Sequence, residues 1–101
     1  MHRSDYISDT EWHRFLDFSK NLETPCIVIN LRAIKDNYLK LRDSFPYANI
    51  YYAVKANPHK AVISLLAGLG ASFDIASCHE LDLVMSLGIT PDRVLYGNTI
   101  K

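Results

Sequence analysis

Apolar residues follow two alternating patterns along the chain. Short runs rich in β-branched and aromatic residues, typical of buried strands, occupy positions 25–31, 50–56, 71–76 and 94–96. Before and between these runs, apolar residues recur every three or four positions, which predicts helices over 8–18, 31–45, 58–69 and 78–87. Strands separated by single helices run parallel, because each crossover helix returns the chain to the same edge of the sheet. The pattern therefore predicts an α/β fold.

Residues at the ends of the apolar repeats indicate where the helices begin. Ser8 stands three positions before Glu11, the spacing of a capping box, and Asn30 can cap the helix that follows it. Asn57 and Pro58 fit the N-cap and the first helical position of the next helix. We therefore expect an N-terminal arm with a short helix over 1–23, and strand-helix units over 24–101.

The number of strand-helix units limits the choice of fold. A (β/α)8 barrel needs roughly 250 residues, whereas this chain has 101. A doubly wound sheet could be this small, but a barrel could be present only as its amino-terminal part. On the barrel interpretation, residues 24–101 are the first part of a truncated barrel, and its last strand has an unpaired edge.

Composition and charge exclude several classes of protein. Eleven basic residues balance eleven acidic ones, so the chain lacks the basic excess typical of nucleic-acid binding. It has neither a signal-peptide core nor an apolar run of membrane-spanning length, which favours a cytoplasmic protein with no membrane partner. Cys26 and Cys78 lie 52 positions apart, and the four histidines show no metal-ligand spacing. We expect two free, packed thiols and no metal site.

Two charged residues fall at the carboxyl ends of neighbouring predicted strands. Lys55 and Asp74 lie 19 positions apart, close to the length over which a strand-helix-strand unit comes back level with itself. Gly97 and Asn98 occupy the same place after the next strand. Strand alternation puts Ala53 and Lys55 on one face, beside Asp74. Parallel sheets and barrels bind their ligands at these ends.

The spacing leaves two interpretations of Lys55 and Asp74 open. The two side chains can form a plain ion pair at the end of a sheet. Alternatively, Lys55 can be a nucleophilic amine, held in a confined site where its neutral form is accessible enough to bond to a carbonyl group. Spacing alone does not choose between them.

Three segments together resemble a known family. They are "YYAVKANP" at 51–58, "GASFDIAS" at 70–77 with "EL" at 80–81, and "LGITPDRVLYGNTIK" at 87–101. Over residues 24–101 the chain is similar to the pyridoxal-phosphate-dependent decarboxylases of basic amino acids, whose barrel is alanine-racemase-like. Within that family it most resembles ornithine and lysine decarboxylases. The resemblance implies the amino-terminal part of such a barrel, with pyridoxal 5'-phosphate as the cofactor.

The resemblance also implies roles for three residues. Lys55 corresponds to the family's lysine that forms the internal aldimine with pyridoxal phosphate, and Asp74 corresponds to an aspartate beside the cofactor. Glu80 corresponds to an acidic residue near that lysine. However, Glu80 also stands three residues after Ser77, which is the position that a helix cap requires. Both interpretations of Glu80 remain open at this point.

The expected activity is that of a carboxy-lyase acting on a small amino acid. The resemblance implies decarboxylation of ornithine to putrescine in polyamine biosynthesis, by a full-length protein that forms a homodimer. Lysine, arginine or diaminopimelate could be the substrate instead, and a racemase on the same barrel or a non-catalytic regulatory homologue remain alternatives. The family's phosphate loop, ring-stacking histidine and catalytic cysteine match no segment here. We therefore expect these 101 residues alone to be inactive.

Overall fold

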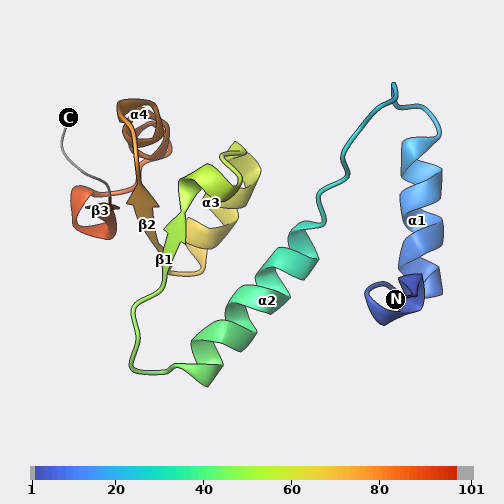
Figure 1. Ribbon diagram of the computed structural model, residues 1–101, viewed down its shortest axis with the longest axis horizontal. Coiled ribbons are helices and arrows are strands. Elements are labelled where there is room, and N and C mark those ends of the chain that lie inside the picture. The colour runs from blue at the N-terminus through green and yellow to red at the C-terminus, as the bar shows by residue number, and fades with distance from the viewer. Residues whose placement is uncertain (1, 98–101) are drawn as a thin grey trace.

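The computed structural model describes residues 2–97, which form alternating helices and strands (Figure 1). The helices are α1 (Asp9–Ser19), α2 (Leu31–Ser44), α3 (Lys60–Gly68) and α4 (Cys78–Ser86). The strands are β1 (Tyr51–Ala53), β2 (Ser72–Ile75) and β3 (Val94–Tyr96). Three short 3-10 turns accompany them, namely η1 (Arg3–Asp5), η2 (Val54–Ala56) and η3 (Pro91–Arg93).

The three strands form one parallel sheet in the order β1-β2-β3. Ala53 of β1 pairs with Asp74 of β2, and Asp74 pairs in turn with Leu95 of β3. This topology confirms the predicted α/β pattern, because parallel neighbours require a crossover such as α3 or α4. All three strands end at the same edge of the sheet, where η2, α4 and Gly97 follow them in the chain.

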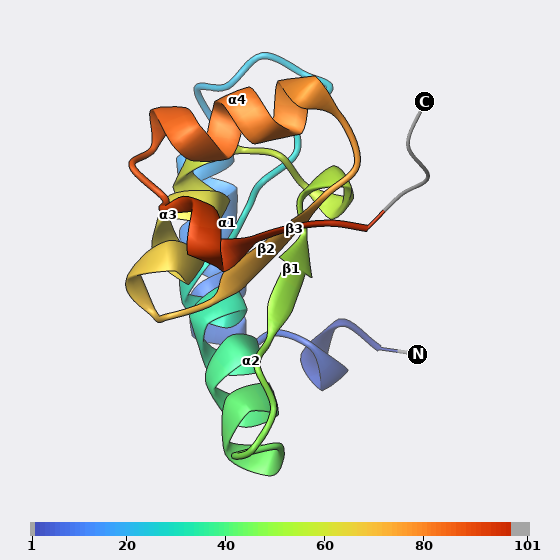
Figure 2. The ribbon, with the colours of Figure 1, turned by 90° about the vertical axis from the view of Figure 1, so that its left-hand side faces the viewer.

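The hydrophobic core lies between the helices and one face of the sheet. Phe73 and Ile75 of β2 are buried, whereas Asp74 between them is only half-buried, because alternate side chains of a strand point to opposite faces. In Figure 2 the helices gather on one side of the strands, so the face that carries Asp74 is left open. The other buried apolar residues are Tyr38, Val54, Val62, Ile63, Leu66, Ala71, Val84 and Ile89.

The helix caps follow the sequence closely in α1 and α2. Ser8 Oγ accepts a hydrogen bond from the Glu11 amide at 3.2 Å, and α1 begins directly after it. Asn30 Oδ1 accepts from the amides of Arg32 and Ala33, and α2 begins at Leu31. Both caps satisfy amides that have no partner inside the helix. The predicted starts of these helices are therefore confirmed.

The prediction of a strand over 25–31 is wrong. Residues 25–30 form no strand or helix, and Ile27 is 91% exposed. Figure 1 shows this segment running from α1 to α2, away from the sheet. An apolar, β-branched sequence satisfies the side-chain requirement of a strand, but a strand also needs a hydrogen-bonded neighbour. No strand in the described range 2–97 lies beside this segment.

The predicted strand over 50–56 is correct only in its first half. The chain pairs from Tyr51 to Ala53 and then enters η2, which contains Lys55. The predicted start of the next helix is also wrong, because α3 begins at Lys60 with His59 as its N-cap. Asn57 is extended, with φ −160° and ψ 105°, as expected for a residue that precedes proline. The Asn-Pro pair therefore ends the turn rather than starting the helix.

The two cysteines are free, as expected, but they are not packed. Cys26 lies in the unpaired segment and Cys78 is the first residue of α4, and both are exposed. Neither cysteine belongs to the hydrophobic core, because residues 25–30 pair with no strand of the described range and Cys78 occupies the exposed first position of α4.

Candidate functional site

Lys55 lies in η2, directly beyond the carboxyl end of β1. The preceding residue, Val54, is fully buried and fixes the turn to the core, whereas Lys55 itself is exposed. Within the described residues, the Lys55 side chain forms no ion pair or hydrogen bond. The chain therefore presents a solvated amine at the end of the sheet. The backbone that carries this amine is anchored to the core by the preceding residue, Val54.

Asp74 lies one strand away, on the open face of the sheet. Its pairing partner Ala53 stands two residues before Lys55, so Lys55 and Asp74 belong to the same edge. No ion pair joins the two side chains in the part of the chain that the structure describes. The interpretation as a plain ion pair thus has no support in the geometry.

The lack of a side chain at Gly97 leaves room for the Asp74 carboxylate. A Cβ atom at position 97 would lie 2.3 Å from Asp74 Oδ1 and 2.9 Å from its Cγ, which is closer than van der Waals contact allows. The backbone of the segment after β3 therefore passes directly against the carboxylate. Asn98, which the sequence placed beside Gly97, lies outside the described residues.

Glu80 takes part in the cap of α4. The Ser77 Oγ atom accepts from the Glu80 amide at 3.2 Å and donates to Glu80 Oε2 at 2.9 Å. The second carboxylate oxygen, Oε1, is buried and has no hydrogen-bond partner in the described part of the chain. The capping interpretation is therefore correct, but it uses only one of the two oxygens. A buried acceptor without a donor is costly, and it fits a site that a bound group completes.

The sequence analysis does not identify Tyr52, whose side chain closes the turn η2 that carries Lys55. The Tyr52 hydroxyl donates to the Asn57 carbonyl at 2.9 Å, which bridges η2 from one end to the other. Burial raises the pKa of Tyr52 above its ordinary value, so the hydroxyl keeps the proton that it donates. A tyrosine five positions before an asparagine is no recognised motif. Only the turn between them brings the two together.

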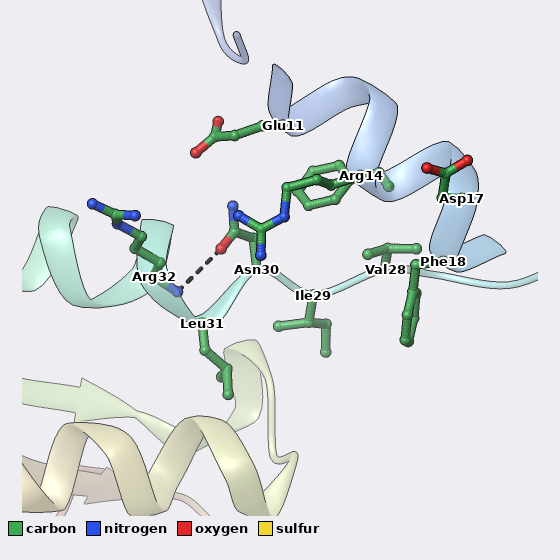
Figure 3. Close-up of a pocket in the computed structure, with 10 residues that line it drawn as sticks. Glu11, Arg14, Asp17, Phe18, Val28, Ile29, Asn30, Leu31 and Arg32 are labelled. Carbon is green, nitrogen blue, oxygen red and sulfur yellow. Dashed lines mark hydrogen bonds between the residues drawn. The ribbon is translucent and has the colours of Figure 1, made fainter. Parts of the chain in front are cut away.

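Two hollows on the surface of the described residues lie away from Lys55. The larger, of about 620 Å³, lies between α1 and residues 28–32. In Figure 3, Phe18 and Val28 line it on one side, and the Arg14 guanidinium lies beside Asn30. The smaller, of about 340 Å³, lies between residues 27–31 and the start of α3. Neither hollow contains Asp74 or Glu80.

Residues 2–97 contain neither a metal cluster nor a membrane-spanning helix. No group of three or more histidine, cysteine, aspartate or glutamate side chains in that range is arranged to hold a metal ion. None of the helices in the same range has the length and apolar character needed to cross a bilayer.

The sequence of residues 31–101 matches the model of the pyridoxal-dependent decarboxylase family, specifically its pyridoxal-binding domain. The chain belongs to this family. It is 40% identical over 83 residues to the lysine/ornithine decarboxylase of Selenomonas ruminantium, and 42% identical over 76 residues to the ornithine decarboxylase of Saccharomyces cerevisiae. These alignments cover 82% and 75% of this chain but only 21% and 16% of the two relatives. The chain thus spans about a fifth or less of the length of the curated relatives it matches.

Solved structures of the family confirm the fold. The lysine/ornithine decarboxylase of Vibrio vulnificus, solved with cadaverine, matches with a TM-score of 0.82 at 30% sequence identity. The match covers 88% of this chain and 24% of that one. The sheet and its helices are therefore the amino-terminal part of the alanine-racemase-like (β/α)8 barrel, as the family resemblance implied.

One relative carries a different kind of name. Antizyme inhibitor 2 of Xenopus laevis is 39% identical over 74 residues, which cover 73% of this chain and 16% of that protein. The similarity over this part of the barrel therefore extends across proteins named for decarboxylation and a protein named for inhibition of another protein.

Pyridoxal phosphate is the cofactor of this domain, and the residues at the strand ends fit it. A structure 36% identical to this chain is a complex with pyridoxal phosphate and cadaverine. In the present chain the strand ends offer an unpaired amine at Lys55, a carboxylate at Asp74 and a buried acceptor at Glu80 Oε1. A carbonyl cofactor that carries a pyridine ring can use an amine and acidic groups of this kind.

Proposed function

We propose that Lys55 is the amine that bonds to pyridoxal phosphate, and that Asp74 and Glu80 help to bind the cofactor. The full-length protein would then decarboxylate a basic amino acid, with L-ornithine as the first substrate and putrescine as the product. The observation that carries the proposal is the position of Lys55. Its side chain is exposed and unpaired within residues 2–97, and it follows a strand whose last residue pairs with Asp74.

The chemistry assigns a separate task to each side chain. Bound pyridoxal phosphate supplies an electron sink for the carbon that loses carbon dioxide. Lys55 would bond to the carbonyl carbon of the cofactor through its amine nitrogen, and its exposed position, in place of the confined site expected from the sequence, leaves that nitrogen accessible. The Asp74 carboxylate, pressed against Gly97, adds negative charge on the same face of the sheet. Glu80 Oε1 is free to accept a hydrogen bond from the bound cofactor or substrate, because no donor among residues 2–97 contacts it.

The identity of the substrate is the finer part of the proposal. The Selenomonas relative is named for both lysine and ornithine, whereas the yeast relative is named for ornithine. Ornithine is common to both names, and this supports it as the first candidate. Lysine is the second candidate, and arginine and diaminopimelate follow. The test is carbon dioxide release from each of the four amino acids by the full-length protein. A preference for lysine, arginine or diaminopimelate would overturn the choice of ornithine.

The decisive experiment is borohydride reduction of the full-length protein after incubation with pyridoxal phosphate. Peptide mapping should find the pyridoxyl group on Lys55. The Lys55→Ala variant should carry none, whereas Lys60→Ala should be labelled like the parent, because Lys60 is an exposed lysine at the start of α3. Absence of the label at Lys55 in the parent would contradict both the enzyme and the cofactor-binding proposals. The Asp74→Asn and Glu80→Gln variants should keep the label but require more cofactor to reach it.

The similarity to antizyme inhibitor 2 supports a second candidate function. On this alternative, the protein is a non-catalytic homologue that regulates polyamine synthesis by binding other proteins. The presence of both Lys55 and Asp74 favours the enzyme. If Lys55 is labelled but none of the four amino acids is decarboxylated, the regulatory homologue becomes the better interpretation.

Assembly and location complete the proposal. A homodimer in the cytoplasm, with a small amino acid as the partner molecule and neither nucleic acid nor membrane, remains the expectation from the sequence. Sedimentation of the full-length protein tests the dimer, and a monomeric active enzyme would contradict it. The 101 residues on their own are expected to release no carbon dioxide.

A further inference from the structure

A single side chain bridges the turn that carries Lys55. Tyr52 lies in the middle of β1, three positions before the lysine, and its hydroxyl donates to the Asn57 carbonyl at 2.9 Å, two positions after it. The five-residue span between donor and acceptor contains the whole of η2. Because η2 is only three residues long, it has few backbone hydrogen bonds of its own. The tyrosine therefore supplies a closing bond that the turn lacks.

The near end of this bridge is anchored in the core. The Tyr52 ring meets the Phe73 ring edge-to-face, with the centroids 6.4 Å apart and the planes at 84°. Phe73 is fully buried in the central strand β2. Edge-to-face contact with an immobile ring restricts the rotation of the tyrosine side chain. The hydroxyl is thus held at one place relative to the sheet.

The far end of the bridge is tied to the start of α3. The Asn57 side-chain oxygen accepts from the His59 amide at 3.1 Å, and His59 Nδ1 accepts from the Ala61 amide at 3.1 Å. Asn57 therefore uses its backbone carbonyl for Tyr52 and its side chain for the residue that caps the helix. Lys55 lies between two anchored points, one on β2 and one on α3.

We propose that Tyr52 is a positioning residue for Lys55, and that its hydroxyl keeps η2 closed so that the amine stays at the carboxyl end of β1. The inference rests on the proposed function of Lys55 as the amine that bonds to the cofactor. A lysine side chain has four rotatable bonds, so its reach is useful only if the backbone beneath it is fixed. Loss of the hydroxyl leaves the half-buried Asn57 carbonyl without its donor and frees the turn to open.

The first test measures the turn without cofactor. Hydrogen exchange of the full-length apoprotein is compared for the parent, Tyr52→Phe and Tyr51→Phe. Tyr51 is the matched control, because it is the neighbouring tyrosine, is 43% exposed, and has no hydroxyl bond within residues 2–97. One hydrogen bond of this kind changes a local opening equilibrium by about two- to tenfold. Exchange over 54–57 should rise by that factor in Tyr52→Phe alone, with β2 unchanged.

The second test asks whether the closed turn matters to the lysine. At saturating pyridoxal phosphate, and well below the melting temperature, the rate at which borohydride-fixable cofactor forms at Lys55 is measured as a ratio to the total cofactor retained. Tyr52→Phe should form the covalent bond about two- to tenfold more slowly at equal total binding, whereas Tyr51→Phe should match the parent. A merely structural role would lower total retention without changing this ratio.

Three results would overturn the inference about Tyr52. A fourth would overturn only the proposed function of Lys55. Unchanged exchange over 54–57 in Tyr52→Phe would show that the hydroxyl does not hold the turn. Faster exchange throughout the barrel would show a general loss of stability instead. Faster exchange over 54–57 with an unchanged rate of covalent bonding would show that the turn does not position Lys55. If the parent itself forms no bond at Lys55, the proposed function fails, while the exchange experiment still reports on the turn.

Discussion

Residues 31–97 and residues 2–30 are stabilised by different kinds of contact. All ten buried apolar residues lie between Tyr38 and Ile89, in the sheet and the helices that cover it. Within the described residues before position 31, none is buried, and Phe18 is 65% exposed. In Figure 1, α1 stands on the far side of α2 from the sheet. The first region is held by burial of apolar surface, and the second by contacts between near neighbours in the sequence.

The local contacts of α1 show what such a region relies on. Ser8 caps the helix, and Arg3 both pairs with Asp9 at 2.8 Å and lies over the Trp12 ring at 5.1 Å. An exposed ion pair is worth little, and a cap is worth about 1 kcal/mol. Burial of a single large side chain in the core exceeds both. Stability and the candidate site therefore reside in the same part of the chain.

The largest expected difference between the two regions comes from a pair of phenylalanines. Phe73→Ala removes a fully buried ring from the central strand and should lower the free energy of unfolding by about 3–5 kcal/mol. Phe18→Ala removes a mostly exposed ring from α1 and should cost less than about 0.5 kcal/mol. Urea denaturation of the full-length protein measures both. Equal losses would refute the comparison.

A comparison of two separate arginine variants gives the next largest expected difference in stability. The Arg93 Nη2 atom donates to the Ala67 carbonyl at 2.8 Å and to the Ala71 carbonyl, which joins the end of α3 to the start of β2. Bonds from a charged donor contribute about 1.5–3 kcal/mol, so Arg93→Met should lose about that much stability. Arg14→Met on the exposed face of α1 should change stability by under about 0.5 kcal/mol. A negligible change in Arg93→Met would show that water replaces the guanidinium.

Two serine caps with the same amide contact allow the closest comparison, although Ser77 Oγ also donates to Glu80 Oε2. Ser8 and Ser77 each accept from the third helical amide at 3.2 Å. Ser77→Ala should lower the free energy of global unfolding by about 1 kcal/mol, because α4 packs on β2. Ser8→Ala should mainly speed hydrogen exchange within α1 and leave global unfolding nearly unchanged. An equal effect of both variants on global unfolding would mean that α1 unfolds together with the sheet.

The smallest expected effect depends on pH. Burial raises the pKa of Tyr52 in the folded chain above its ordinary value of 10.0. The contribution of its phenol to stability is therefore fully present below pH 10 and is lost as the pH rises through the folded pKa. The stability difference between the parent and Tyr52→Phe should therefore shrink above pH 10. Denaturation curves across this pH range test the sign, and a widening difference would contradict it.

The sequence predicts the sheet well wherever each residue's environment follows from its neighbours along the chain. Alternation over 71–76 predicts β2, and the spacing of Ser77 and Glu80 predicts the start of α4. The cap of α4 depends on contacts within a few residues, whereas β2 also pairs with β1 and β3, about twenty positions away in the chain. The parallel order of the strands also follows from local information, because a single helix between two strands leaves few other arrangements.

Predictions that depended on distant partners were wrong or incomplete. Residues 25–30 have strand composition, yet no neighbour in the described range pairs with them. The sequence pattern places Lys55 at the end of a strand, but it lies in a turn that is closed by Tyr52. No local pattern indicates the contacts of Arg93, which reaches two carbonyl groups more than twenty positions earlier. The roles of Lys55, Asp74 and Glu80 toward the cofactor remain predictions.

The close approach of position 97 to Asp74 sets a limit on how this chain can vary. Any side chain there meets the carboxylate at its first carbon, whereas a Cβ atom at Gly68 would meet nothing within 4 Å. In a library that samples every amino acid at both positions, variants at 97 should be depleted more than variants at 68 under selection for cofactor retention. A residue with a side chain at 97 has to displace the Asp74 carboxylate from its present place, so the neighbouring strand sets the cost of each substitution at this position.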